Sequence, residues 1–277
     1  MAALKPFHNT YRCTGTAGDD ARDLVLLHGW GLHSIVWDDV MPALLQYFRV
    51  TVIDLPGMGQ SPLPNQDYTL DFLVEQVHAV MPVQCHLVGW SLGGLVGIRL
   101  AQRFPQQVLS LVTVACSPCF VARDGWPSAM RADILQKFAE LYEEDNEGTL
   151  IRFLALNAKG SDTQQQDVAK LRDILYFCGL PAPRALREGL VILRDTDLRD
   201  AVKELGQPVL MLFGEHDHIV PAAALEAVRD LAPQVEVALM QGVSHVPQVS
   251  APDIFARALQ DFWRDAFPDV MGVINER

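Results

Sequence analysis

Short apolar runs recur along the chain and are separated by segments of helical length. Six runs rich in β-branched residues are the candidate strands: residues 24–28, 50–55, 84–88, 108–114, 209–213 and 235–240. Most are continuously apolar, as expected of parallel strands covered on both faces. Residues 34–48, 70–81 and 92–104 have the length and spacing of helices. This alternation predicts an α/β protein with a mostly parallel, doubly wound sheet.

One interval, residues 120–195, breaks the alternation and contains no convincing strand. Helical apolar spacing instead appears over residues 131–142, 150–156 and 182–194. We expect this segment, called segment 120–195 below, to form a helical lid over the strand ends. Residues 1–119 and 196–277 would then form the α/β core. The alternative is that these helices pack elsewhere on the molecule.

Composition narrows the class of protein. A chain of 277 residues with 49% hydrophobic residues suits one large domain with an insertion. No apolar run reaches 18 residues, and residues 1–12 lack the apolar centre of a signal peptide, so we expect a cytoplasmic protein without a membrane partner. The net charge of −12 argues against a nucleic-acid partner. We also expect a monomer.

The five cysteines are an odd number and do not make a disulfide framework. Cys116 and Cys119 have C-x-x-C spacing, but no second pair follows and they do not open a helix. We interpret them as ordinary buried thiols.

Gly89-Trp90-Ser91-Leu92-Gly93 matches G-x-S-x-G, the pattern of a serine on a sharp strand-to-helix turn. A strand is predicted just before it and a helix just after it. Such a turn needs glycines because a strained serine backbone leaves no room for nearby Cβ atoms. The pattern predicts an exposed nucleophilic hydroxyl beside a helix N-terminus; a plain glycine-flanked turn is the alternative.

A serine nucleophile needs a general base, and the base needs an orienting carboxylate. In hydrolases of this pattern the acid and then the histidine follow the serine in the chain. Asp217 and His245 each lie a few residues beyond a predicted strand, so they are the predicted acid and base. Glu215 competes with Asp217 but lies closer to its strand. His216 and His218 have H-x-H spacing without a third ligand, so no metal site is predicted.

An ester-cleaving site also needs hydrogen-bond donors aimed at the oxyanion of the intermediate. The backbone N–H of Leu92, directly after the nucleophile, is one predicted donor. The turn Gly29-Trp30-Gly31 after the first strand supplies the other, the N–H of Trp30; a plain glycine-rich turn is the alternative. Asp54, at the next strand end, is predicted to stabilise its turn rather than to act in catalysis.

These motifs resemble the α/β-hydrolase superfamily from about residue 24 to 264. Residues 28–32 (HGWGL) with Trp37, residues 89–95 (GWSLGGL), residues 111–127 and residues 152–156 (RFLAL) are similar to the pimeloyl-acyl-carrier-protein methyl ester esterases of biotin synthesis. The resemblance implies a serine carboxylesterase that releases methanol from a pimeloyl chain carried by acyl carrier protein. It implies no cofactor.

By that resemblance Ser91, Asp217 and His245 form the triad, and Trp30 and Leu92 contact the oxyanion and substrate. Lid residues take the wall of the acyl site: Phe153, Leu154, Ala155, Leu156 and Asn157. Arg152 matches a lid arginine that contacts the acidic carrier. Residues 161–169 depart from the family, with glutamine and alanine where basic residues are expected. Lys159, Lys170 and Arg172 are possible substitutes.

Two other functions remain open. One is a general short-chain carboxylesterase or carbon–carbon bond hydrolase of the same fold, which would share the triad and differ in the lid. The other is a ligand-binding receptor that retains a triad with little turnover.

Overall fold

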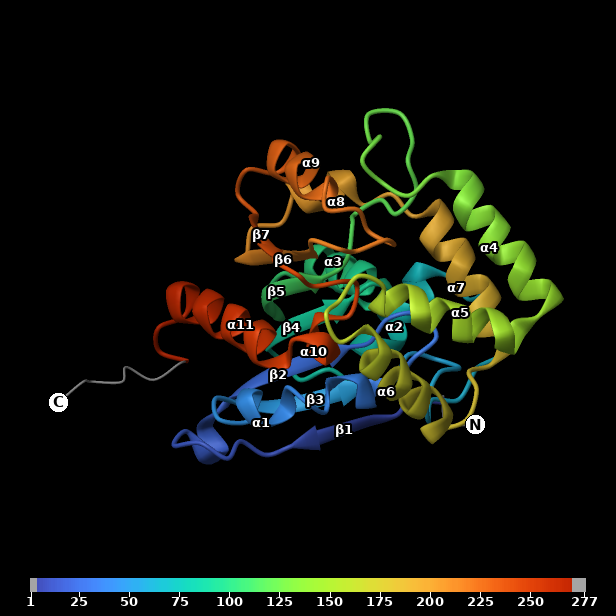
Figure 1. Ribbon diagram of the computed structural model, residues 1–277. Coiled ribbons are helices and arrows are strands. Elements are labelled where there is room, and N and C mark those ends of the chain that lie inside the picture. Colours follow the sequence, from blue (N-terminus) through green and yellow to red (C-terminus); the bar gives the residue numbers. More distant parts are fainter. Residues whose placement is uncertain (1–3, 271–277) are drawn as a thin grey trace.

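The structure, a computed structural model, describes residues 4–270. Its centre is a seven-stranded sheet in the order β1-β3-β2-β4-β5-β6-β7 (Figure 1). The strands are β1 (His8–Tyr11), β2 (Arg22–Leu27), β3 (Phe48–Ile53), β4 (Cys85–Trp90), β5 (Val108–Val114), β6 (Val209–Gly214) and β7 (Glu236–Met240). Only β1 is antiparallel to its neighbour. The predicted α/β class and mostly parallel sheet are therefore confirmed.

Helices cover both faces of the sheet. Outside segment 120–195, the helices are η1 (Gly18–Asp20), η2 (Ser34–Trp37), α1 (Met41–Leu44), α2 (Leu70–His78), α3 (Leu92–Arg103), α8 (Arg199–Lys203), α9 (Ala224–Leu231), α10 (Pro247–Ser250) and α11 (Pro252–Ala266). His86 on β4 contacts the ring of Trp263 in α11, whereas Leu87 lies against Gly97 of α3. Successive strand residues point to opposite faces, so α11 and α3 cover opposite faces of the sheet.

Two elements differ from the sequence prediction. Strand β1 is not predicted because its four residues are all exposed and carry no apolar pattern; it pairs antiparallel at the sheet edge. Residues 34–48 are not one helix but the short η2 and α1. Pro42 occupies the first turn of α1, where a proline is tolerated, and β3 begins at Phe48, which leaves no length for a longer helix.

Segment 120–195 contains α4 (Ala132–Glu144), α5 (Asn146–Ala158), α6 (Gln164–Phe177) and α7 (Pro183–Asp195). Its only β pairings within the described chain are isolated bridges. Figure 1 shows these four helices gathered at one end of the sheet. The chain leaves the sheet after β5 and returns to the neighbouring strand β6.

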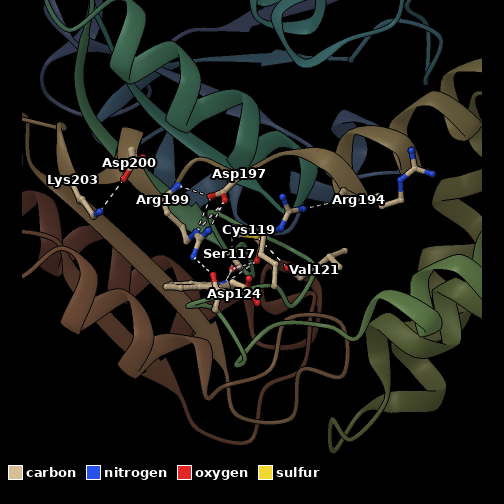
Figure 2. A network of polar contacts seen from close by, with 11 residues as sticks. Ser117, Cys119, Val121, Asp124, Arg194, Asp197, Arg199, Asp200 and Lys203 are labelled. Atoms are coloured by element: carbon tan, nitrogen blue, oxygen red, sulfur yellow. Dashed lines mark hydrogen bonds and ion pairs between the residues drawn. The ribbon is translucent and has the colours of Figure 1, made fainter.

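Polar contacts tie together the two ends of segment 120–195 (Figure 2). Arg199 forms a bidentate ion pair with Asp197 and donates a third hydrogen bond to the carbonyl of Asp124, at 3.0 Å. Arg123 donates to the carbonyl of Arg194 at 2.7 Å. These contacts place the entrance and the exit of the segment side by side.

No helix among residues 4–270 combines the length and the apolar character needed to cross a membrane.

Candidate active site

Ser91 lies on the turn between β4 and α3, with φ of 53° and ψ of −115°. A positive φ is rare and costly for a residue with a side chain. Close backbone packing explains the flanking glycines: a Cβ on Gly89 would lie 2.3 Å from the carbonyl oxygen of Gly93, and one on Gly93 would lie 2.5 Å from that of His28. The strained serine turn predicted from the sequence is therefore present. The prediction of an exposed hydroxyl is wrong, because Ser91 is only 3% exposed.

Asp217 and His245 lie on the loops after β6 and β7 and are joined directly. His245 Nδ1 donates to Asp217 Oδ2 at 2.8 Å, and both side chains are fully buried. Asp217 Oδ1 accepts the backbone N–H groups of Ile219 and Val220, at 2.7 and 2.9 Å. One carboxylate oxygen thus fixes the loop, while the other holds the hydrogen on Nδ1 and leaves Nε2 as the basic nitrogen.

Trp90 links this pair to the serine turn. Its indole Nε1 donates to the carbonyl of His245 at 2.7 Å, and the two ring centroids lie 5.7 Å apart. Since Trp90 directly precedes Ser91, the serine turn and His245 meet at one edge of the sheet. His245 Nε2 is buried and has no hydrogen-bond partner among the described residues, so it is not yet bonded to Ser91 Oγ.

Glu215 has a different place from Asp217. Its Oε2 accepts the backbone N–H of Gly242 at 2.8 Å, which joins the two loops that carry Asp217 and His245. His216 lies 3.9 Å from Glu215. In residues 4–270 no group of three or more His, Cys, Asp or Glu side chains could hold a metal ion.

The backbone N–H groups of Trp30 and Leu92 have no protein acceptor within the described chain. Leu92 begins α3, so its N–H belongs to the first turn, which lacks intrahelical partners. The Cβ position of Gly29 lies 3.1 Å from Ser91 Cβ, so the turn that carries Trp30 lies against the serine. Two free donors thus lie on the two turns that meet at Ser91.

His28 and Asp54 support the turn before Trp30. His28 Nδ1 donates to the carbonyl of Gly29 and its Nε2 accepts the N–H of Leu55, both at 2.8 Å. Burial lowers the pKa of His28 to about 4, which keeps the ring neutral. Asp54 accepts the N–H groups of Ser34 and Gln60, so the turn-stabilising role predicted for it is confirmed.

Comparison with known proteins agrees with this geometry. Residues 24–252 match the family model described as alpha/beta hydrolase fold. A pimeloyl-[acyl-carrier protein] methyl ester esterase of Aeromonas hydrophila is 42% identical over 241 residues, covering 87% of this chain and 94% of that protein. The protein of the same name from Klebsiella pneumoniae is 40% identical, covering 88% and 94%. The chain belongs to this esterase family within the α/β hydrolases.

Solved structures give the same architecture. A bromoperoxidase from Bacillus anthracis matches with a TM-score of 0.81 at 22% identity, covering 96% of this chain and 97% of its own. An esterase from Exiguobacterium antarcticum matches with a TM-score of 0.82 at 19% identity, covering 94% and 96%. At these identities the solved structures establish the fold alone.

Beside Trp30, this member of the esterase family has an apolar cavity of about 60 Å³. Its lining comes mainly from segment 120–195: Phe120, Met130, Ile134, Leu135, Phe138, Phe153, Leu156, Leu190 and Leu193, with Trp30 and Ile219. Of the five residues predicted for the acyl-site wall, Phe153 and Leu156 line the cavity. Leu154, Ala155 and Asn157 do not.

Asn157 instead forms hydrogen bonds to the loop after β7 that carries His245. Its carbonyl accepts the N–H of His245 at 3.1 Å and the hydroxyl of Ser244 at 2.7 Å. Its Nδ2 donates to the carbonyl of Phe153, and its Oδ1 is buried without a partner among the described residues. Sequence reasoning could not find this role because a main-chain acceptor leaves no trace in residue type.

The basic residues of segment 120–195 are mostly engaged. Arg152 is exposed on α5 and lies 3.7 Å from Asp145. Lys170 forms an ion pair with Asp39, and Arg172 lies over the ring of Tyr176. The family resemblance led us to expect cations within residues 161–169, and the exposed side chains there on α6 are instead glutamines and an alanine: Gln164, Gln165, Gln166 and Ala169.

Cys116 and Cys119 are free thiols and both are buried. Burial raises the pKa of each thiol, which opposes formation of the reactive thiolate. The structure therefore agrees with the interpretation of this pair as ordinary buried cysteines.

Proposed function

We propose that this chain is a serine esterase that hydrolyses the methyl ester of a pimeloyl group carried by acyl carrier protein, as in biotin synthesis. The observation that carries the ester chemistry is the hydrogen-bonded Asp217–His245 pair, held against the strained turn of Ser91 by Trp90. The names of the relatives that share about 40% of their residues with this chain support the choice of substrate.

The acylation step uses Ser91 as nucleophile and His245 as base. Nε2 of His245 accepts the Ser91 hydroxyl proton while Oγ bonds to the ester carbonyl carbon. The carbonyl oxygen becomes an oxyanion and accepts hydrogen bonds from the N–H groups of Trp30 and Leu92. The carbon–oxygen bond to the methoxy group then breaks, and His245 returns the proton so that methanol leaves.

Deacylation repeats this chemistry with water. His245 removes a proton from water as its oxygen attacks the acyl-enzyme carbonyl, and Ser91 Oγ leaves with the proton from His245. Asp217 keeps the imidazole tautomer fixed and stabilises the imidazolium in both steps. The residues named here suffice for hydrolysis without a cofactor.

Segment 120–195 acts as a lid that shapes the acyl site. The cavity beside Trp30 is lined by aliphatic and aromatic side chains, which favour methylene groups over a charged carboxylate. Phe153 and Leu156 form part of its wall. The cavity therefore suits the methylene chain of the acyl group, whose ester end lies at Ser91.

The test compares methyl pimeloyl-acyl carrier protein with free short-chain esters, by measuring methanol release with the purified chain. We expect a higher kcat/KM for the carrier-bound ester. Ser91→Ala should lower kcat roughly 10⁴- to 10⁶-fold with unchanged thermal unfolding. A Ser91→Ala variant that keeps most of its activity would remove Ser91 from the nucleophile role.

Arg152 is proposed as a carrier contact. Arg152→Ala should raise KM for the carrier-bound ester several-fold because an exposed cation facing an acidic carrier contributes to association. It should leave hydrolysis of p-nitrophenyl acetate unchanged. Arg257→Ala is the matched control, because Arg257 is an exposed arginine on α11, outside segment 120–195. An equal rise in KM in both variants would mean that the carrier responds to the overall charge of the protein and makes no specific contact with Arg152.

The second candidate is a short-chain carboxylesterase. The glutamines and the alanine within residues 161–169 favour it, because they stand where the family resemblance implies cations that would hold an acidic carrier. A preference for free esters, together with failure to restore growth without biotin to a bacterium lacking its own esterase, would support this function instead.

A further inference from the structure

The turn that carries the N–H of Trp30 has little main-chain support. Within the described chain, no hydrogen bond joins the backbone of residues 29–32 to the backbone of any other segment. Backbone hydrogen bonds fix a strand or a helix in place, but they do not connect this turn to the rest of the molecule. The position of the predicted oxyanion donor therefore depends on side chains.

Two side chains of the core hold the ends of the turn. His28 bonds both to the carbonyl of Gly29 and to the N–H of Leu55. Asp54 Oδ1 accepts the N–H of Ser34 at 2.8 Å. These contacts fix the turn from the side of the sheet.

Two further contacts hold the turn from segment 120–195. Trp30 Nε1 donates to the carbonyl of Leu186 in α7 at 2.9 Å. His33 Nε2 donates to the carbonyl of Ile174 in α6 at 2.7 Å. Both contacts are buried, and they join positions 156 and 141 residues apart in the chain.

The His33 ring donates to a backbone carbonyl near the C-terminus of α6 that would otherwise lack a hydrogen-bond partner. Ile174 belongs to the last four residues of α6, whose carbonyls lack intrahelical partners. His33 is 1% exposed, and its Nδ1 faces the thiol of Cys178, with 4.0 Å between Nδ1 and Sγ. The carbonyl acceptor places the hydrogen on Nε2, so the ring acts as a fixed donor.

We propose that His33 is a positioning residue for the oxyanion turn. Through Ile174 it anchors the turn to α6, so that the N–H of Trp30 is aimed at the developing oxyanion. This inference rests on the proposed esterase function. It makes α6 a structural part of the active site in addition to a cover over it.

The test uses His33→Leu and His33→Gln with p-nitrophenyl acetate, a substrate that needs no carrier. Leucine fills the site without a donor, whereas the amide nitrogen of glutamine reaches the position of ring Nε2. We expect His33→Leu to lower kcat roughly 10- to 100-fold with little change in KM. This loss is smaller than the loss of kcat expected when an oxyanion donor is removed altogether, because the N–H of Trp30 is still present. We expect His33→Gln to keep most of the wild-type kcat.

A second measurement separates positioning from stability. Phenylboronic acid adds to a serine Oγ and places an oxygen in the oxyanion site, so its inhibition constant should rise in His33→Leu as kcat/KM falls. His86→Leu is the matched control, because His86 is equally buried and bonds to Ser110 at a distance from the site. It should change thermal unfolding but neither kcat nor boronate binding.

The outcomes are distinct. A His33→Leu variant with wild-type kcat and boronate binding overturns the positioning role and leaves the proposed function standing. An equal loss of kcat in His33→Leu and His86→Leu also overturns it, because the effect is then one of stability. A wild-type chain that hydrolyses no ester overturns the proposed function and this inference together.

Discussion

The two oxygens of Asp217 have separate tasks, and a single substitution distinguishes them. Asp217→Asn keeps the size of the side chain but can donate its amide N–H to His245 Nδ1, which moves the histidine hydrogen to Nε2. That tautomer cannot accept the proton of Ser91, so we expect kcat to fall roughly 10³- to 10⁴-fold. The measurement is p-nitrophenyl acetate hydrolysis with thermal unfolding in parallel.

Glu215→Gln is the control for that substitution. Glu215 accepts the N–H of Gly242, and glutamine retains an oxygen acceptor, so kcat should stay within about threefold of wild type. If Glu215→Gln lost as much activity as Asp217→Asn, the orienting acid would have to be reassigned to Glu215.

At the residue scale, chain order and strand ends are enough to predict which three residues the structure brings to one edge of the sheet. Ser91, Asp217 and His245 could be chosen because parallel strands bring their carboxyl ends to one edge. The side-chain donors of Trp30, His33 and Trp90 could not be predicted. Each bonds to a main-chain carbonyl more than 100 positions away, and a carbonyl has the same chemistry in every residue.

At the scale of the element, the serine turn depends on the close approach of α3 to β2. Gly93→Ala would place a Cβ 2.5 Å from the carbonyl oxygen of His28 and 2.6 Å from that of Leu27, so the helix or strand must shift. We expect a loss of about 1–3 kcal/mol in the free energy of unfolding, measured by urea denaturation. We also expect reduced kcat, because the shift moves the N–H of Leu92.

Gly206→Ala is the corresponding control. Gly206 is exposed, and a Cβ there meets nothing within 4 Å. Its free energy of unfolding should stay within about 0.5 kcal/mol of wild type. A Gly93→Ala variant as stable as Gly206→Ala would show that the turn has room the structure does not display.

Elements were predictable where burial imposes a pattern. β4 and β5 are buried almost throughout, so their apolar runs are unambiguous. β1 is exposed at all four positions and pairs only at the edge, which leaves no pattern to read. The stretch at residues 34–48 has helical spacing, but spacing does not reveal that the turn at Asp38–Val40 separates η2 from α1.

At the scale of the whole molecule, two buried histidines make stability depend on pH. Desolvation lowers the pKa of His28 and of His86 to about 4, whereas an unfolded histidine has a pKa near 6.5. The unfolded chain therefore binds more protons between these values, and stability falls as pH drops from about 6.5 to 4. Each histidine should lower the free energy of unfolding by about 2 kcal/mol between pH 7.5 and pH 5. Urea denaturation at the two pH values measures the sum.

His86→Leu isolates one of the two contributions. His86 lies between Phe48, Trp263 and Phe267, away from the catalytic loops, so a leucine there removes the titrating group without touching the site. The other histidines and the carboxylates are the same in both proteins and cancel in the comparison. The fall in unfolding free energy between pH 7.5 and 5 should then be about 2 kcal/mol smaller in the variant. An equal fall in both proteins would mean that His86 already takes up its proton in the folded state, and the acid sensitivity would have to arise elsewhere.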